Sequence, residues 1–317
     1  MTQRWPELDY EADRRVIETL HAYLQVMGKL PTRALPWCNH SWHLALRVVP
    51  RGFRSYPVEM PGGEAEVIFD CLSSAVAVES STGFADGFEV AGQSVARFHE
   101  QLAGLLRHAG VSTDISGAPN EVETAIPFHE DTDEREWDEA TLARIHRAFS
   151  DANRVFERFR SGFVGKSSPS HLFWGSFDLA VTRFSGREAP LHPGGFPNLP
   201  DRVTREAYSH EVASAGFWLG GGGVDEAAFY AYGYPTPDGF GEAAVEPEAA
   251  YWHGELGEFV LPYAAVREAE DPERALMQFL ESTYAAVADR GEWARDRLEI
   301  PLGQYGEPYD VEAQREG

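Results

Sequence analysis

The chain has 317 residues, of which 43% are hydrophobic and 12% aromatic, so it can bury a large core and is not intrinsically disordered. Its formal net charge of −24 argues against binding to nucleic acid or to an anionic membrane surface. No apolar run approaches the roughly 20 residues of a membrane helix, and no signal peptide is recognisable. We therefore expect a soluble cytoplasmic protein.

The first half of the chain predicts a helix, strands and a second helix. Apolar residues at three- to four-residue spacing predict a helix over 9–27 that ends at Gly28. Ser94 is a typical N-cap for the next helix, which Gly110 ends. Between these helices, alternating or apolar runs predict strands over 42–49, 65–72 and 75–80.

The second half predicts a similar order of elements. Asp138 is expected to cap a helix whose apolar stripe ends at Gly165, and Asp271 is expected to open a closing helix that stops at Gly291. Strands are predicted over 171–184, 210–218, 227–234 and 258–263. The run GGGG at 220–223 lacks the context of a phosphate-binding loop and is expected to form a hairpin or loop.

This repetition indicates an internal duplication. The segments VMGK and SWHLALRVV align with FVGK and SFDLAVTRF, which places Lys29 opposite Lys166 and His43 opposite Asp178. Tandem copies usually pack about a pseudo-twofold axis and share a core. We therefore expect an α+β protein of two pseudo-symmetric helix–three-strand–helix repeats, with mostly antiparallel sheet and helices packed on it.

The expected repeats form one compact unit, and a homo-oligomer is compatible with the sequence. Repeat 1, an acidic connection, repeat 2 and a C-terminal tail are predicted over 1–112, 113–137, 138–291 and 292–317. The two cysteines, Cys38 and Cys71, have no spacing typical of a disulfide framework or a metal motif, so we expect both to be buried apolar residues.

Lysine is rare in this chain, and both lysines, Lys29 and Lys166, follow a glycine. A bias towards arginine codons is one explanation. Arginine, however, replaces lysine poorly where a compact ammonium or a lowered pKa is needed. Each lysine either bonds the carbonyls at a helix end or, together with Arg183, holds a carboxylate or phosphate; a Schiff-base nucleophile is a third alternative.

Histidines and acids gather in the predicted strand regions, and three interpretations stay open. The first is acid–base catalysis, because histidine carries protons near neutral pH. Its candidates are His43, Asp178, His210 and Glu211. The second is a divalent transition metal held by His171, His192 and His210, although their spacing matches no known metal signature. The third is a set of structural, hydrogen-bonded histidines.

Long motifs of the chain resemble a bacterial family of unknown function, number 5996. They are FVGKSSPSHLFWGSFDLAVTRFSGREAPLHPGG, PNLPDRVTREAYSHEVASAGFW and AFYAYGYP, together with WPEL, GK and NHSWHLAL near the N-terminus. The resemblance supplies no activity and no catalytic residues. It implies that several candidate residues belong to family motifs, namely His171, Asp178, Arg183, His192, His210 and Glu211.

The leading functional expectation is a hydrolase-type enzyme that acts on a small anionic molecule in a cleft between the repeats, with metal dependence left open. Two alternatives from other classes remain. Tyr230, Tyr232 and Tyr234 alternate along one predicted strand and share a face, so they suit the aromatic pocket of a non-catalytic binding protein. The same face also suits a protein-interaction module.

Overall fold

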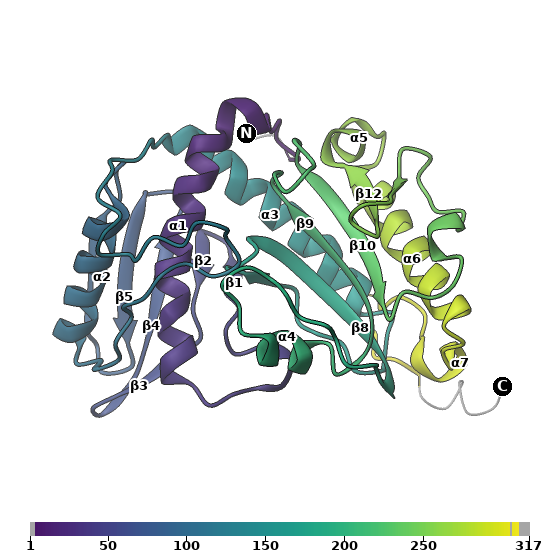
Figure 1. Ribbon diagram of the computed structural model, residues 1–317, viewed down its shortest axis with the longest axis horizontal. Helices are drawn as coiled ribbons and strands as arrows, with labels where there is room; N and C mark the ends of the chain where they lie inside the picture. The colour runs from purple at the N-terminus through teal and green to yellow at the C-terminus, as the bar shows by residue number, and fades with distance from the viewer. Residues whose placement is uncertain (1–3, 305, 311–317) are drawn as a thin grey trace.

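The computed structural model describes residues 4–304 and 306–310 and contains two antiparallel sheets of six strands each (Figure 1). The predicted α+β class is confirmed. The first sheet runs β1-β2-β4-β5-β6, with β3 paired to β4. Its strands are β1 (Arg47–Val49), β2 (Gly52–Arg54), β3 (Val58–Met60), β4 (Gly63–Asp70), β5 (Ala75–Ser80) and β6 (Ala85–Glu89).

The second sheet runs β11-β12-β10-β9-β8-β7. Its strands are β7 (His171–Phe173), β8 (Asp178–Glu188), β9 (His210–Trp218), β10 (Ala228–Tyr234), β11 (Tyr251–His253) and β12 (Glu258–Pro262). Each sheet therefore has more strands than the three predicted per repeat. The additional ones are mostly three-residue strands, which are too short to produce a recognisable period-2 pattern.

Helices flank both sheets. They are α1 (Tyr10–Ala34), α2 (Val95–Ala109), α3 (Glu139–Arg160), α4 (Asp201–Ala207), α5 (Tyr263–Glu268), α6 (Pro272–Arg290) and α7 (Arg295–Leu298), with 3₁₀ turns η1 (Asn39–Ser41) and η2 (Phe240–Glu242). The predicted caps are confirmed: Ser94, Asp138 and Asp271 each accept a hydrogen bond from a backbone N–H of the first helical turn. Within the described residues, no helix has the length and apolar character needed to cross a membrane.

The first helix does not end at Gly28, as the sequence predicted, but continues to Ala34 through Pro31. A Cβ at position 28 would overlap the indole ring of Trp174, so this glycine permits a close approach of two segments rather than ending a helix. Lys29 consequently lies inside α1, whereas Lys166 lies in the segment after α3. The two Gly-Lys pairs thus occupy different local structures, and the internal duplication stays a prediction.

The predicted strand over 42–49 is only partly formed. Residues 39–41 make the 3₁₀ turn η1, in which His40 and Ser41 have left-handed φ values of 57° and 60°. Strand pairing begins at Leu46, which exchanges two 2.8 Å backbone hydrogen bonds with Leu172 of the second sheet. This pair joins the edges of the two sheets.

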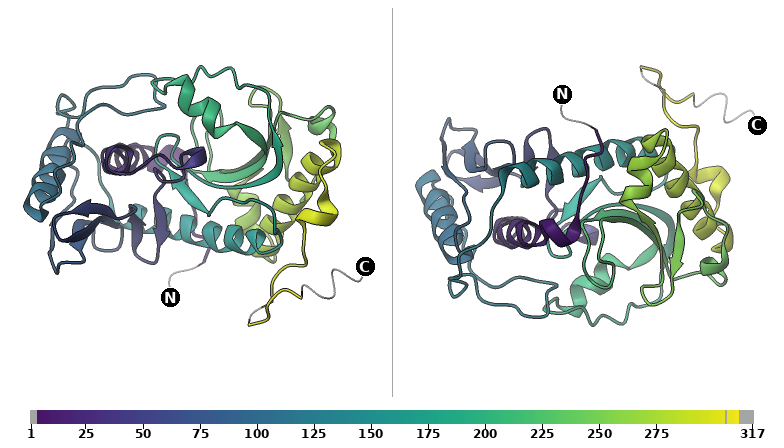
Figure 2. Two further views of the ribbon diagram at one scale, coloured as in Figure 1. Left: turned by 90° about the horizontal axis from the view of Figure 1, so that it is seen from below. Right: turned by 90° about the horizontal axis from the view of Figure 1, so that it is seen from above.

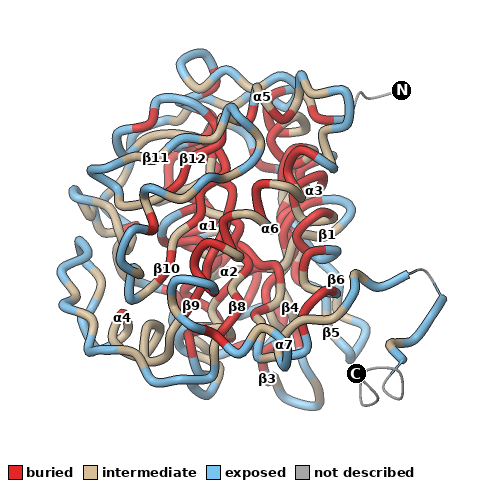
Figure 3. The backbone as a smooth tube through the Cα atoms, turned by 90° about the vertical axis from the view of Figure 1, so that its right-hand side faces the viewer, coloured by how far each residue is buried: buried red, intermediate tan, exposed pale blue. Residues whose placement is uncertain are grey.

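The second sheet is strongly curved, with α3 and α6 on one side and α4 with its neighbouring loops across the other (Figure 2). Side chains alternate between these sides. Leu179 and Val181 of β8 are buried in the core, which contains residues from both halves of the chain. Buried residues concentrate on the long helices and the central strands, whereas α4 and the loops around it are more exposed (Figure 3).

The contact between Gly28 and Trp174 gives a test of the fold. We expect Gly28→Ala to lower the free energy of unfolding by about 1–3 kcal/mol, because the added methyl group must displace the indole ring. Gly104→Ala is the matched control, since Gly104 is also helical but has only the end of a flexible arginine near its Cβ position. It should be neutral or stabilising by up to about 1 kcal/mol. Equal effects in urea unfolding would contradict the close-approach interpretation.

Candidate functional site

The side of β8 that faces away from α3 and α6 carries the first candidate residue, Asp178. Strand pairing places Asp178 beside Trp218 of β9, and Thr182 beside Ser214, on the concave face of the sheet. The hydroxyls of Ser176 and Tyr230 both donate hydrogen bonds to the Asp178 carboxylate. Burial raises the pKa of Asp178, while these two hydrogen bonds favour its ionised form.

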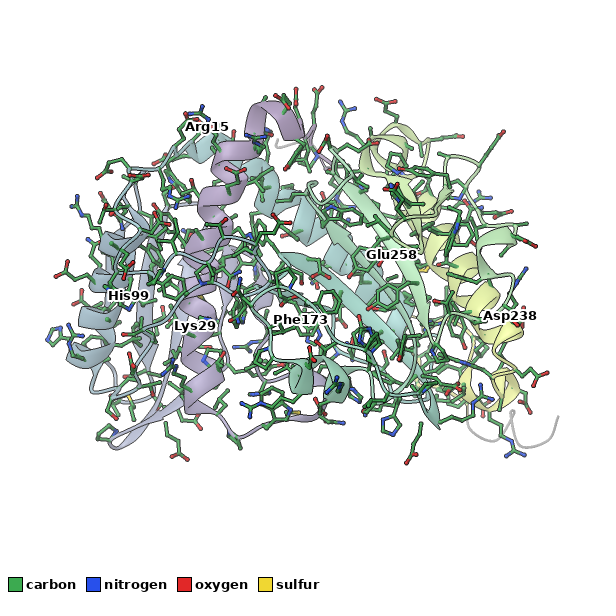
Figure 4. All side chains as sticks on the ribbon, viewed as in Figure 1. Arg15, Lys29, His99, Phe173, Asp238 and Glu258 are labelled. Atoms are coloured by element: carbon green, nitrogen blue, oxygen red, sulfur yellow. The ribbon has the colours of Figure 1, made fainter. Side chains whose placement is uncertain are left out.

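Two further carboxyl groups lie near enough to Asp178 for its charge to act on them, and no sequence pattern indicated either one. Glu258, which is labelled in Figure 4, begins β12. The register of β10 with β12 places it on the same face as Tyr230 and Tyr232. Glu121 comes from the connection between the two halves, and its carboxylate lies against Gly175, where a side chain would collide with it. Burial, with the charge of Asp178 as the second cause, raises the pKa of both glutamates to about 7.

Hydrogen bonds fasten Glu121 over the sheet. Its backbone N–H donates to Pro197 O at 3.0 Å, and the side-chain amide of Asn198 donates to Val122 O at 2.7 Å. Asn120 is tied to α1 by two hydrogen bonds with Gln25 of 2.8 and 3.0 Å. The connection is therefore a fixed part of the site.

Three non-glycine residues in this region have left-handed backbone conformations. They are Glu121, Asn198 and Phe177, the residue before Asp178, with φ values of 58°, 51° and 60°. Such conformations cost free energy and persist where the surrounding structure enforces them, often at functional sites. Their proximity to the carboxyl groups supports a functional role for this face.

Tyrosine side chains line the part of the concave face next to Asp178. Tyr230 and Tyr232 lie on one side of β10, as alternation predicted, and their rings stack at 6.0 Å between centroids. The hydroxyls of Tyr232 and Tyr208 lie 2.6 Å apart. Burial raises the pKa of Tyr232 to about 12. These phenols are therefore neutral hydrogen-bonding groups near pH 7.

A cationic group lies at the other end of this face. The Lys166 ammonium donates to His40 Nε2 at 2.5 Å, and because Nδ1 of His40 faces Ala207 O at 2.8 Å, that nitrogen must carry the ring proton. The His210 ring lies 5.8 Å from the His40 ring. Burial lowers the pKa of Lys166, whose ammonium also lies 4.9 Å from the centre of the Phe184 ring.

The predicted anion-holding residues are not brought together. Lys29 donates to Asn120 Oδ1 and lies over Trp174, and among the described residues it shares no contact partner with Lys166. Burial, with Arg33 as the second cause, lowers the pKa of Lys29 to about 8. Arg183 has the opposite strand parity from Asp178 and Thr182, so it faces the helices on the other side of the sheet.

The four acid–base candidates do not meet as His43 with Asp178 or as His210 with Glu211. His43 Nδ1 accepts a hydrogen bond from the Cys38 backbone N–H at 3.2 Å. Glu211 faces away from His210 along β9 and forms an ion pair of 2.6 Å with Arg187. Asp178 instead has hydroxyl partners, because the residues nearest to it are set by the pairing of β8 with β9 and of β9 with β10.

The predicted metal ligands are also separated. His171 is 1% exposed, neither of its ring nitrogens has a partner among the described residues, and burial lowers its pKa to about 3. His192 stacks on Tyr208 at 4.7 Å. Over the described part of the chain, no group of three or more His, Cys, Asp or Glu side chains is arranged to hold a metal ion.

Comparison with known proteins defines the class to which this chain belongs. The sequence model of the family of unknown function DUF5996 matches residues 5–300, which is nearly the whole chain. The chain belongs to this family, as its motifs predicted. Searches of the curated proteins and of the solved structures found no match.

The raised pKa of Glu258 predicts a pH-dependent stability. An unfolded glutamate loses its proton near pH 4.5, whereas folded Glu258 keeps it until about pH 7, so the protein loses stability as the pH rises through this window. Glu258→Gln removes this loss. We expect the variant to gain about 3 kcal/mol relative to wild type between pH 4.5 and pH 8 in urea unfolding.

The control for this measurement is Glu255→Gln. Glu255 is exposed in the turn before β12, so its substitution should leave the pH slope of wild type unchanged. If Glu258→Gln also kept the wild-type slope, Glu258 would have an ordinary pKa in the folded protein and would not be protonated near pH 7.

Proposed function

We propose that the protein is a hydrolase-type enzyme that uses carboxyl groups for acid–base catalysis on an uncharged, hydroxyl-bearing substrate. The observation that carries this proposal is the gathering of Asp178, Glu121 and Glu258 on one concave face, where burial, with the charge of Asp178 as the second cause, raises the pKa values of the two glutamates. Structural ion pairs do not explain this arrangement, because no basic side chain within the described residues forms an ion pair with any of the three.

Hydrolysis requires one group to give a proton to the leaving oxygen and another to take a proton from the attacking water. A glutamic acid with a pKa near 7 is protonated often enough to be the donor. Asp178, whose charge is favoured by two donated hydroxyl bonds, suits the role of acceptor. Paired carboxyl groups with these two roles are the usual apparatus of glycoside hydrolysis.

The surroundings of the carboxyl groups favour an uncharged substrate over the anionic one that the sequence suggested. Three carboxyl groups repel an anion once they ionise, but carboxylates accept hydrogen bonds from substrate hydroxyls. Trp218 and Tyr230, whose rings lie 5.4 Å apart, add flat apolar surface next to Asp178. Lys166, further along the face, is the group that would meet an anionic substituent of a longer substrate.

A non-catalytic binding protein is the second candidate. A group of rings favours it, since Tyr208 lies 4.7 Å from His192 and 5.2 Å from Tyr234, and Tyr234 donates to Pro190 O at 3.0 Å. Such a ring cluster beside hydroxyl groups can hold a planar or sugar-like ligand without any proton transfer.

The enzyme hypothesis is tested with a panel of 4-nitrophenyl glycosides, with 4-nitrophenyl acetate as an ester probe. We expect release of nitrophenol from at least one glycoside, and Asp178→Asn should lower kcat by about 100-fold or more because the proton acceptor is lost. Asp238→Asn is the control, since Asp238 is exposed and lies away from the concave face (Figure 4). It should keep full activity.

Two outcomes would contradict catalysis at this site. The first is turnover that survives in Asp178→Asn. The second is saturable binding of a glycoside, followed by tryptophan fluorescence, without any release of nitrophenol from any probe in the panel. The second outcome would instead support the binding protein.

A further inference from the structure

A hollow of about 480 Å³ lies on the helix-covered side of the second sheet, away from Asp178. Helix α6 forms one wall, and the segment that follows α7 forms another. Its charged and polar lining includes Arg183, Glu246, Gln278, Glu281, Arg295 and Glu299. This volume is within the range of sites for small molecules.

Arg183 lies at the base of the hollow as a buried cation that forms no direct ion pair within the described residues, although the charges of Glu299 and Glu281 act on it. The residue is 4% exposed, and its guanidinium carbon lies 3.5 Å from the centre of the Phe159 ring and 4.4 Å from that of Tyr284. One Nη donates to Phe159 O at 2.5 Å, whereas Nε has no partner. In the described part of the chain, no carboxylate forms an ion pair with it.

An uncompensated buried charge costs free energy, and arginine is the side chain best suited to bind a carboxylate with two parallel hydrogen bonds. Burial lowers the pKa of Arg183 to about 10, so it stays charged at neutral pH. The aromatic rings stabilise the cation in part, but they supply no hydrogen-bond acceptor for Nε. The base of the hollow is therefore suited to an anionic group.

The rim of the same hollow has the opposite charge. Glu281 is exposed, and its charge acts on Arg183. Glu246 accepts a 3.3 Å hydrogen bond from Gln278, and neither glutamate forms an ion pair with a basic side chain within the described residues. Arg295 does not offset them, because it is held between Asp289 at 2.6 Å and Glu299 at 2.5 Å.

We propose that this hollow binds a small zwitterion, with its carboxylate on Arg183 and its ammonium group towards Glu246 and Glu281. Free amino acids are the chemical class with these two groups. An acidic rim above a single buried cation disfavours phosphate and dicarboxylates, which bring more negative charge than Arg183 can neutralise. The site is independent of the catalytic proposal, because it lies on the other face of β8.

Four compounds of four carbons each test the proposal by calorimetry on the full chain. They are L-2-aminobutyrate, 4-aminobutyrate, butyrate and butylamine. We expect one of the aminobutyrates to bind at least about tenfold more tightly than either single-charge compound, because only a zwitterion engages both ends of the site. L-2-aminobutyrate and 4-aminobutyrate differ in the distance between ammonium and carboxylate, so the tighter binder shows which charge separation fits the site.

Two variants locate the binding. Glu281→Gln should weaken the aminobutyrate about tenfold without weakening butyrate, and it keeps the fold because Glu281 is exposed. Arg183→Met should abolish binding of both. Glu268→Gln, an exposed residue at the end of α5, is the control and should change nothing.

Three results would overturn the proposal. These are no heat of binding for any of the four compounds at millimolar concentration, butyrate binding as tightly as the aminobutyrates, or aminobutyrate binding that is unchanged in Glu281→Gln. Because Glu281→Gln leaves the core untouched, the answer does not depend on whether Arg183→Met folds.

Discussion

The packing of Trp174 against α1 is the contact on which the arrangement of the two halves depends. Its indole ring lies where a side chain at Gly28 would be, and its Nε1 donates to Leu44 O at 2.9 Å. The strand pair between Leu46 and Leu172 follows directly from this contact, because Trp174 is two residues beyond Leu172. The Lys29 ammonium also contacts Trp174, at 5.1 Å from the centre of the ring. A single aromatic side chain thereby fixes a helix of one half and the sheet of the other.

Strand β8 shows how one sheet separates two chemical environments. Asp178 and Thr182 point to the concave face, where hydroxyls and carboxyl groups gather, whereas Arg183 points among the aromatic rings of α3 and α6. The period of two along a strand is enough to keep an acidic group and a basic group of the same strand from neutralising each other. Both then have the free charge that binding or catalysis needs.

The sequence predicted those parts of the fold that local patterns determine. Strand β9 was predicted at its observed limits, and Ser94, Asp138 and Asp271 were identified as caps, because alternation and capping act between near neighbours. Gly28 was misinterpreted as a helix end because its effect comes from a distant tryptophan. A glycine in a helix has the same local signature whether it ends the helix or admits a ring.

The candidate site was predicted in part for the same reason. The sequence predicts Asp178 as a site residue because it lies in a strand with a polar face. It predicts that Tyr230 and Tyr232 share a face because they alternate along their strand. Glu121 was indistinguishable from the other acids of a polar connection. Its position depends on the hydrogen bond that its backbone N–H donates to Pro197 O, and on the bonds between the preceding Asn120 and Gln25. Pro197 and Gln25 both lie far away in the sequence. No spacing rule along the chain could have paired it with Asp178.

That position of Glu121 also bears on how the two halves depend on each other. The connection before α3 is a linker by its sequence, but it lies across the second sheet and contributes one of the three carboxyl groups. A gene encoding only the portion from α3 onward would yield Asp178, Tyr230 and Glu258 without their third partner. The connection thus ties the two halves together at this group of carboxyl side chains, in addition to the core that they share.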